Sequence, residues 1–367
     1  MRRPRGLLKA VLPASLLRGL HHDPCVYRQY PPRPLSVDQP AASPPDNPPR
    51  IALVTPCYNH AAYIASTIES VLGQGYPNLC YAVHDGGSTD GSAAIIASYA
   101  DRLADQRSEP DRGQADAINR AFAHTEGEIM AWLNSDDLLL PGTLAYVASF
   151  FRANPWCDVL YGHRVIIDER GLEVGRWALP AHSRAAFVHS DLVPQETLFW
   201  RRSIWERAGG RVDPGFQFAL DWDLLLRFER VGARFHRADR FLGAFRTHER
   251  QKSIAERSGR GAEEIGRLRR ARLRGPAHAL WWRARTRVYC ARMAMRTARL
   301  SPDPVAGSSE ARIDAVHRAA SRAPVSTPGG PAAGPPESGS AAPGVGPANA
   351  SQRVVVRGGT TPAGRGR

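Results

Sequence analysis

The chain contains 367 residues with a formal net charge of +14, and the position of that charge argues against a nucleic-acid partner. Residues 51–250 hold 20 basic and 25 acidic residues, so the positive excess lies in residues 1–50 and 251–367. A domain that binds a nucleic-acid backbone carries its positive potential on the folded body. The five cysteines include no CxxC pair, which excludes a zinc site of closely spaced cysteines.

Both ends of the chain have the composition of segments without a hydrophobic core. Residues 1–49 form a Pro-rich N-terminal segment, whose part from 24 to 49 we interpret as a linker, and residues 301–367 form a low-complexity tail that we expect to be disordered. The basic N-terminus has an apolar run interrupted by Lys9, and no small-residue cleavage site follows it. Because no stretch of eighteen apolar residues occurs, we expect a cytoplasmic protein with one folded domain at residues 50–255.

In chain order, this domain alternates between short apolar runs and helical periods. Strands are expected at residues 51–56, 79–85 and 128–134, and helices at residues 61–75, 91–104, 115–124 and 143–154. Such alternation predicts an α/β fold in which a mostly parallel sheet is flanked by helices on both faces.

Polar side chains follow three of the predicted strands. Tyr58 and Asn59 follow the first strand, Asp85 ends the second, and Asp136 and Asp137 follow the third. Because ligands of parallel sheets bind at the carboxyl ends of the strands, we expect these groups to line one crevice.

The adjacent aspartates in LNSDDLLLPG indicate either a metal site or the start of a helix. Two neighbouring carboxylates repel one another unless a cation lies beside them, and oxygen ligands of this kind suit Mg²⁺ or Mn²⁺. Alternatively, Asn134 or Ser135 caps a helix, and the aspartates interact favourably with its dipole.

Asp85 in HDGGSTDGS presents a similar choice. A tight turn followed by a helix cap explains the two glycines. It does not explain a carboxylate at the end of a buried strand, which needs a hydrogen-bond partner such as a base N–H or a ribose hydroxyl.

Seven motifs, in one order along about two hundred residues, resemble the family 2 glycosyltransferases with the GT-A fold, of the type that builds bacterial surface polysaccharides in the cell envelope. They are TPCYNHAAYIASTIESVLGQ, DGGSTDGS, DRGQADAINRAF, GEIMAWLNSDD, PQETLFWRRS, LDWDLLLRF and FRTHERQKS. The resemblance implies an inverting transfer of a sugar from a nucleotide-diphosphate sugar, with a UDP-sugar favoured, to a hydroxyl group of a glycan or a lipid-linked saccharide. It also implies a divalent cofactor, Mn²⁺ or Mg²⁺.

The resemblance assigns roles position by position. The residues that match nucleotide-binding positions are Thr55, Tyr58, Asn59, Asp85, Arg112, Asp116 and Asp136. The matching metal ligands are Asp136, Asp137 and His248, with Asp137 most directly on the cation. The family often has an acidic residue where this chain has Asn134, which leaves the division of labour between the two aspartates open. Arg246 is a further candidate for contact with phosphate oxygens.

Asp221 matches the position of the family's catalytic base. The reaction needs a carboxylate near the acceptor hydroxyl, to take its proton as the oxygen attacks the anomeric carbon. Asp223, two residues later, is a rival base and an acceptor-side candidate, and a helix N-cap would explain Asp221 without any catalytic role. Gln195 and Glu196 fall where residues that contact the acceptor are expected, although polar residues that begin a strand would look the same.

Residues 256–300 form a basic helical extension in which one stripe is apolar and arginines surround it. The stripe comprises Trp281, Ala284, Val288, Ala291, Met295 and Ala298. A basic amphipathic helix of this kind lies on an anionic membrane, here the inner face, or packs its stripe on the folded domain. Both interpretations of residues 281–298 are open at this point.

Two other functions are compatible with the predicted fold. Sugar-phosphate nucleotidylyltransferases carry a Gly-rich basic loop after the first strand, where this chain has TPCYNHAAY without a glycine. A binding protein that retains the nucleotide-sugar pocket without catalysis is the second alternative. The presence of Asp85, Asp136, Asp137 and Asp221 together favours an enzyme.

Overall fold

The computed structural model describes residues 29–249, 251, 259–273 and 275–301, all of which belong to one compact unit. The predicted disordered tail, apart from Ser301, lies outside the described residues, as does the N-terminal segment up to residue 28. The strands are β1 Gln29–Arg33, β2 Ile51–Cys57, β3 Leu79–Asp85, β4 Asp105–Ser108, β5 Ile129–Trp132, β6 Leu138–Leu139, β7 Val159–Ile167, β8 Glu173–Trp177, β9 Phe199–Arg201 and β10 Phe235–Arg246.

The α-helices are α2 Ile64–Leu72, α3 Ser92–Ala97, α4 Gln114–Ala123, α5 Thr143–Ala153, α6 Arg184–His189, α7 Arg202–Arg207, α8 Leu220–Arg230, α10 Arg260–Arg272 and α11 Pro276–Leu300. Two 3-10 helices, η1 and η2, cover Ala100–Arg102 and Gln195–Thr197. Every strand and helix predicted between residues 51 and 154 is present, although most of the helices are shorter than expected.

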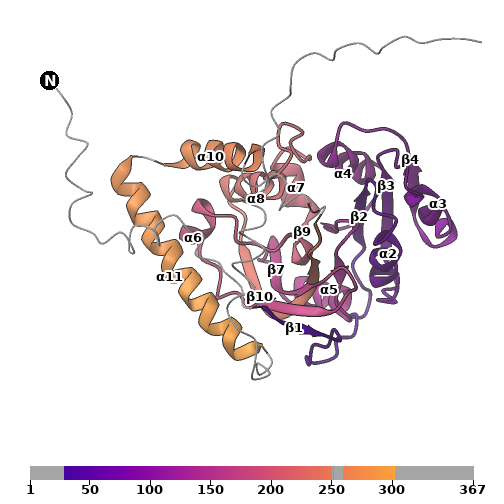
Figure 1. The fold of residues 1–367 in the computed structure, drawn as a ribbon, viewed down its shortest axis with the longest axis horizontal. Helices are drawn as coiled ribbons and strands as arrows, with labels where there is room; N and C mark the ends of the chain where they lie inside the picture. Colours follow the sequence, from indigo (N-terminus) through magenta and orange to yellow (C-terminus); the bar gives the residue numbers. More distant parts are fainter. Residues whose placement is uncertain (1–28, 250, 252–258, 274, 302–367) are drawn as a thin grey trace, which may run out of the picture. The chain divides into compact units, whose positions relative to one another are not determined.

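The strands of the described residues form one sheet with the order β1-β8-β7-β9-β5-β2-β3-β4, and β10 pairs with β6 and β7 (Figure 1). In the first half of the domain, β5, β2, β3 and β4 are parallel neighbours, which confirms the predicted α/β class. The second half adds antiparallel pairs, because β9 runs antiparallel to both β5 and β7. Strand β4 was not predicted, since its sequence DQRS has no apolar residue.

Alternate side chains of β2 point into cores on opposite faces of the sheet. Leu53 packs with Ile68 of α2 and Val147 of α5 on one face. Val54 packs with Ile118 of α4 and Trp132 on the other. Because both faces of these parallel strands are covered, their apolar residues are consecutive and do not alternate with polar ones, as expected for a buried sheet.

The prediction that residues 24–49 form a linker is wrong for the described part, residues 29–49. Strand β1 pairs antiparallel with β8, and the Tyr30 hydroxyl donates to the buried carboxylate of Glu173. Arg33 pairs with the same carboxylate at 3.0 Å, and Arg240 donates to the Pro40 carbonyl at 2.7 Å. Prolines are tolerated because β1 is an edge strand, where a missing N–H breaks no ladder.

Helix α11 packs on the domain through a different stripe from the one its apolar pattern indicates. Thr286, Tyr289, Cys290, Met293 and Thr297 are buried, and the Thr297 hydroxyl accepts the Ala178 N–H at 3.0 Å. The predicted apolar stripe is instead exposed. Packing against α6 and β8, together with the Thr297 hydrogen bond, therefore decides the packed face rather than hydrophobicity alone. No helix in the described part of the chain is long and apolar enough to span a bilayer.

Helix α10 holds the start of α8. The Glu264 carboxylate accepts the backbone N–H groups of Gln217, Phe218 and Ala219 at 2.9–3.0 Å. These residues lie directly before α8, whose first turn carries Asp221 and Asp223. The extension after residue 256 thus fixes a segment that contains the predicted base.

Candidate active site

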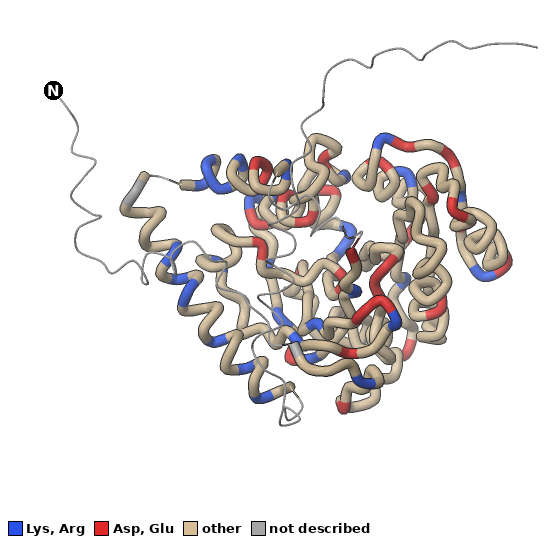
Figure 2. Tube along the Cα trace, viewed as in Figure 1, with Lys and Arg blue, Asp and Glu red and all other residues tan. Residues whose placement is uncertain are grey.

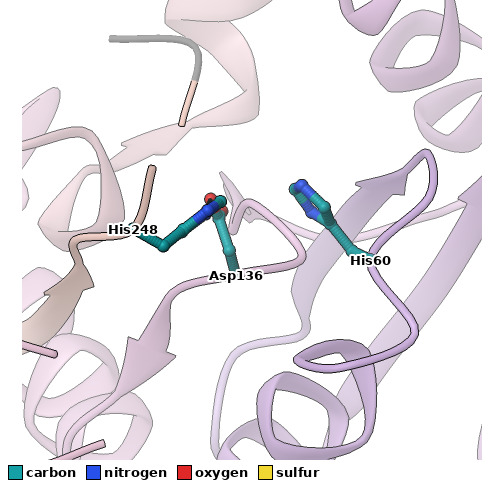
Figure 3. Close-up of side chains that lie close together, drawn as sticks. All are labelled: His60, Asp136 and His248. Atoms are coloured by element: carbon teal, nitrogen blue, oxygen red, sulfur yellow. Dashed lines mark hydrogen bonds and ion pairs between the residues drawn. The ribbon is translucent and has the colours of Figure 1, made fainter. Parts of the chain in front are cut away.

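The loops that follow β2, β5 and β10 converge at the carboxyl ends of the strands and bring together three side chains that are able to ligate a metal. His60, Asp136 and His248 each offer one ligand atom, and these atoms all lie within 4.8 Å of one another (Figure 3). His248 Nε2 lies 3.0 Å from an Asp136 carboxylate oxygen, and His60 Nδ1 lies 2.6 Å from the Ser135 hydroxyl. Asp136 and His248 are buried, and His60 is half-buried.

The donor set of this cluster fits a divalent cation. Burial lowers the pKa of His60, which favours the neutral imidazole that a metal requires. The contact between its Nδ1 atom and Ser135 leaves Nε2 available, and such a partner on the second nitrogen orients a ligating histidine. Two imidazole nitrogens and one carboxylate favour a transition ion such as Mn²⁺ over Mg²⁺, which takes oxygen ligands almost exclusively.

Asp137, which the resemblance places most directly on the cation, lies outside this cluster. Its carboxylate accepts the Arg246 backbone N–H at 3.0 Å. Burial and the neighbouring Asp136 raise its pKa well above the usual range. Arg246 is also engaged, because its guanidinium donates to the Asp136 carbonyl at 2.8 Å and to the Ser66 hydroxyl at 3.2 Å. These contacts hold the loop that presents Asp136, and they occupy the guanidinium that was a candidate for contact with phosphate.

Asp85 is fully buried and already has hydrogen-bond partners within the protein. Its carboxylate accepts the N–H groups of Gly87 at 3.2 Å and Ser88 at 3.0 Å, together with the hydroxyls of Ser88 and Ser108. The hydrogen-bond donors that we expected from a nucleotide are thus supplied by the turn after β3 and by β4. Thr55 is equally enclosed, since its hydroxyl lies 2.9 Å from that of Tyr81.

We expect Asp85→Ala to lower the free energy of unfolding by about 3 kcal/mol, because it leaves buried hydroxyl and amide donors without their charged acceptor. Urea denaturation measures this loss. Asp101→Ala, at an exposed position of the neighbouring 3-10 helix, is the matched control and should change stability by less than about 0.5 kcal/mol. Equal stabilities of the two variants would contradict the structural role of Asp85.

The remaining predicted nucleotide contacts lie on the loops after β2 and β4 and in the first turn of α4. The Tyr58 side chain is 62% exposed, although it follows a buried strand, so its ring is free to stack on a base. Asn59 adopts a positive φ of 53° and accepts the Thr89 N–H at 2.9 Å, which joins the loop after β2 to the loop after β3. Arg112 is exposed and pairs with Asp116 at 3.0 Å, and this pairing lowers the Asp116 pKa to about 2.

Of the two candidate bases, Asp221 has the more suitable surroundings. Asp223 forms an ion pair with Arg227 within α8 at 2.8 Å, which occupies its carboxylate. Asp221 makes no ion pair in the described structure, and one of its oxygens accepts the Trp222 N–H at 2.8 Å. Burial raises the pKa of Asp221 from 3.8 to about 6, close to the pH at which a general base operates.

The predicted acceptor-side residues Gln195 and Glu196 are both buried in η2. Gln195 donates to the Trp132 carbonyl at 2.8 Å. Glu196 forms a bidentate ion pair with Arg164 of β7, in which Arg164 Nε lies 2.8 Å from one carboxylate oxygen. The Arg164 guanidinium also lies over the Phe245 ring. The Arg164–Glu196 pair acts electrostatically on both Asp137 and Asp221, which places these two carboxyl groups near one charged centre.

Sequence reasoning did not single out His60, Ser135 as its partner, or Arg164. His60 was visible in the motif TPCYNHAAY, and its position at a strand end was the signal that could have identified it. Arg164 lies mid-strand in β7 without a local motif, so only its pairing with Glu196 identifies it.

Residues 52–204 match the sequence family described as "Glycosyl transferase family 2". Among curated proteins, an uncharacterized glycosyltransferase of Mycobacterium tuberculosis is 28% identical over 184 residues, which are 49% of this chain and 68% of that protein. The putative glycosyltransferase EpsE of Bacillus subtilis is 27% identical over 197 residues, which are 51% of this chain and 69% of that protein.

Among solved structures, the chain resembles the mannosyltransferase PcManGT of Pyrobaculum calidifontis, whose structure contains GDP-Man and Mn²⁺. The TM-score is 0.50 at 20% identity, and the match covers 76% of this chain and 82% of the other. At this identity the likeness concerns the fold alone, and it confirms the predicted α/β fold.

Proposed function

The chain is a family 2 glycosyltransferase by the match of residues 52–204, and we propose that it moves a sugar from a nucleotide-diphosphate sugar to a hydroxyl acceptor with inversion of the anomeric centre. The acceptor would be a glycan or a lipid-linked saccharide of the cell envelope. The observations that carry this proposal are the His–Asp–His cluster and a second acidic group, Asp221, whose pKa is raised to about 6 and which shares the electrostatic influence of Arg164 and Glu196 with Asp137, the neighbour of Asp136. Donor binding, a cation and a base are the three elements that the reaction requires.

The donor would lie along the loops after β2 and β3. The exposed ring of Tyr58 would stack on the base, and the Arg112–Asp116 pair would contact base and ribose. Asp85 would act chiefly by shaping the turn at Gly87, because its oxygens already accept four hydrogen bonds. A UDP-sugar is the favoured donor.

His60, Asp136 and His248 would hold the cation, with a transition ion such as Mn²⁺ preferred over Mg²⁺, whose ligands are almost all oxygens. When bound, the cation neutralises the charge that develops on the departing diphosphate. The Asp137 carboxylate stabilises the loop that presents Asp136, because it accepts the Arg246 backbone N–H. The bound water and diphosphate oxygens would complete the coordination of the ion.

Asp221 would act as the general base. Its carboxylate would take the proton of the acceptor hydroxyl while that oxygen forms a bond to the anomeric carbon. The bond between this carbon and the diphosphate oxygen breaks on the opposite side, which releases the nucleoside diphosphate and inverts the centre. The Arg164–Glu196 pair beside Asp221 helps to set its proton affinity, because Arg164 lowers the pKa and Glu196 raises it.

A thermal-shift screen of the full chain against UDP-, GDP-, dTDP- and CDP-sugars, with and without Mn²⁺, tests the proposed function. A ligand present at a hundredfold its dissociation constant stabilises the fold by about 2.7 kcal/mol. We expect one donor to stabilise the protein more in the presence of Mn²⁺. The absence of any manganese-assisted stabilisation by a nucleotide or its sugar conjugate would overturn the proposal.

The pKa of about 6 for Asp221 predicts an acid limb in the pH profile of transfer. Below pH 6, kcat/KM should fall about tenfold per pH unit, because only the ionised carboxylate accepts a proton. Initial rates across the pH range, measured in the presence of saturating Mn²⁺, check this. An unchanged rate well below pH 6 would exclude Asp221 as the base.

The same shift has a defined sign for stability. Because folding raises the pKa of Asp221 from 3.8 to about 6, the folded state binds this proton more tightly than the unfolded chain. The stability that this group contributes is present at low pH and is lost as the pH rises through this interval. Urea denaturation of the wild type and of Asp221→Asn, recorded below and above this pH interval, gives the free energy of unfolding at each pH. The change with pH that Asp221 causes should be absent from the variant.

A further inference from the structure

The outward face of α11 combines exposed apolar side chains with uncompensated positive charge. Trp281, Val288 and Met295 are 49%, 52% and 57% exposed, and they follow one another along the helix at intervals of seven residues. At 3.6 residues per turn this spacing places them on one side of the helix. The opposite stripe is the one buried against the domain, so this apolar face has no partner among the described residues.

Positive charge surrounds this face. The 25 residues of α11 include six arginines and no Asp or Glu (Figure 2). Arg292 and Arg299 are exposed, and neither forms an ion pair within the described part of the chain. The net charge of residues 51–250 is negative, so the basic face of α11 is opposite in charge to the domain on which the helix packs.

Two hollows lie between α11 and the loop that follows β8. The larger, of about 490 Å³, is lined by Arg237, Arg292, Arg296 and Arg299 over an apolar floor that includes Pro180. The smaller, of about 260 Å³, shares Arg292 and adds Arg285 and Val288. Arg296 is held in place by Asp239, whereas Arg292 reaches both hollows without such a partner. Each hollow therefore presents guanidinium groups beside the exposed apolar stripe.

From this combination we propose that α11 docks on a bilayer that contains anionic phospholipids. The exposed stripe would enter the boundary between headgroups and acyl chains, and the arginines in the hollows would contact headgroup phosphates. A helix with an apolar face bordered by arginines has the composition of an interfacial helix, and a tryptophan at its end suits the membrane–water boundary. A nucleic-acid backbone would account for the arginines alone, and it offers no apolar surface for Val288 and Met295.

Sedimentation of the full chain with vesicles tests this docking. Vesicles of phosphatidylcholine mixed with phosphatidylglycerol are compared with vesicles of phosphatidylcholine alone. We expect the protein to sediment with the anionic vesicles and to remain in solution with the zwitterionic ones. A wild-type chain that does not bind the anionic vesicles would overturn the proposal.

Two sets of variants separate the helix from the other basic segments of the chain. Trp281→Ser, Val288→Ser and Met295→Ser together remove the apolar stripe without a change of charge, and Trp156→Ser, at another exposed site, is their control. Arg292→Gln with Arg299→Gln removes two charges, and its control, Arg230→Gln with Arg270→Gln, removes two exposed arginines elsewhere. All positions are solvent-exposed, so the variants should melt like the wild type.

We expect partition onto anionic vesicles to fall at least tenfold in the stripe variant, and roughly thirtyfold in the α11 arginine variant at low ionic strength. The two control proteins should bind like the wild type. If the α11 variants and their controls lost partition equally, the net charge of the chain would be responsible and the proposed docking face would be wrong.

Discussion

Asp221→Asn should reduce sugar transfer roughly a thousandfold while leaving the affinity for the donor unchanged. The amide has the same shape as the carboxyl group but cannot take the acceptor proton. Because burial already favours the neutral form of Asp221, the fold should accept the amide without loss of stability. Release of nucleoside diphosphate in the presence of acceptor measures the rate, and calorimetric titration with the donor measures the affinity.

Asp223→Asn is the matched control for that experiment. Asp223 lies on the same helix, two residues away, and pairs with Arg227. Its replacement removes the ion-pair partner of the partly buried Arg227, which keeps its hydrogen bond to the Ala208 carbonyl, and should cost stability, about 3 kcal/mol at most, while transfer stays within a few-fold of the wild type. Near-normal turnover in Asp221→Asn together with inactivity in Asp223→Asn would reverse the assignment of the base.

Removing any member of the His60–Asp136–His248 cluster should weaken Mn²⁺ binding about a hundredfold or more. Asp136→Asn, His60→Ala and His248→Ala each delete one of three converging donor atoms, and loss of even an orienting partner typically costs 10- to 100-fold in metal affinity. The electron paramagnetic resonance signal of free Mn²⁺, followed during titration with protein and a nucleoside diphosphate, reports binding without any turnover.

Two further variants decide between the cluster and the assignment drawn from the family resemblance. His124→Ala, at an exposed position after α4, controls for the loss of a histidine and should leave Mn²⁺ binding unchanged. Asp137→Asn should disturb Mn²⁺ binding less than His60→Ala does, because the Asp137 carboxylate holds the Arg246 backbone. The reverse order of affinities would return the main ligand role to Asp137 and remove His60 from the site.

The order and type of most elements between residues 51 and 154 followed from local pattern, with the short strands β4 and β6 as exceptions. Short apolar runs such as IALVTP form strands when both faces of the sheet are covered. The helices between them are recognised from the helical spacing of their apolar residues. The same patterns located the polar motifs at strand ends. Because parallel strands end at one edge, the approximate place of the site followed without knowledge of any side-chain contact.

Tertiary contacts decided what each candidate side chain faces. Asp85 ends a buried strand and Asp136 follows one, yet Asp85 is enclosed by its own turn and by β4, whereas Asp136 meets histidines from two other loops. Asp221 and Asp223 differ because an arginine one helical turn away claims only the second. The contacts of Asp136 with His60 and His248, and of Asp85 with Ser108, join residues distant in sequence, which no local pattern records.

The two flanks show the same division most clearly. Composition identified the Pro-rich segment, and the spacing of apolar residues and arginines identified the basic amphipathic helix. Which part of the first would pair with β8, and which face of the second would pack on α6 and β8, depended on these tertiary partners. Tyr289 and Met293 join the apolar core, whereas Val288 and Met295 stay exposed, because packing and hydrogen bonding to a particular surface select one apolar face of the helix over another.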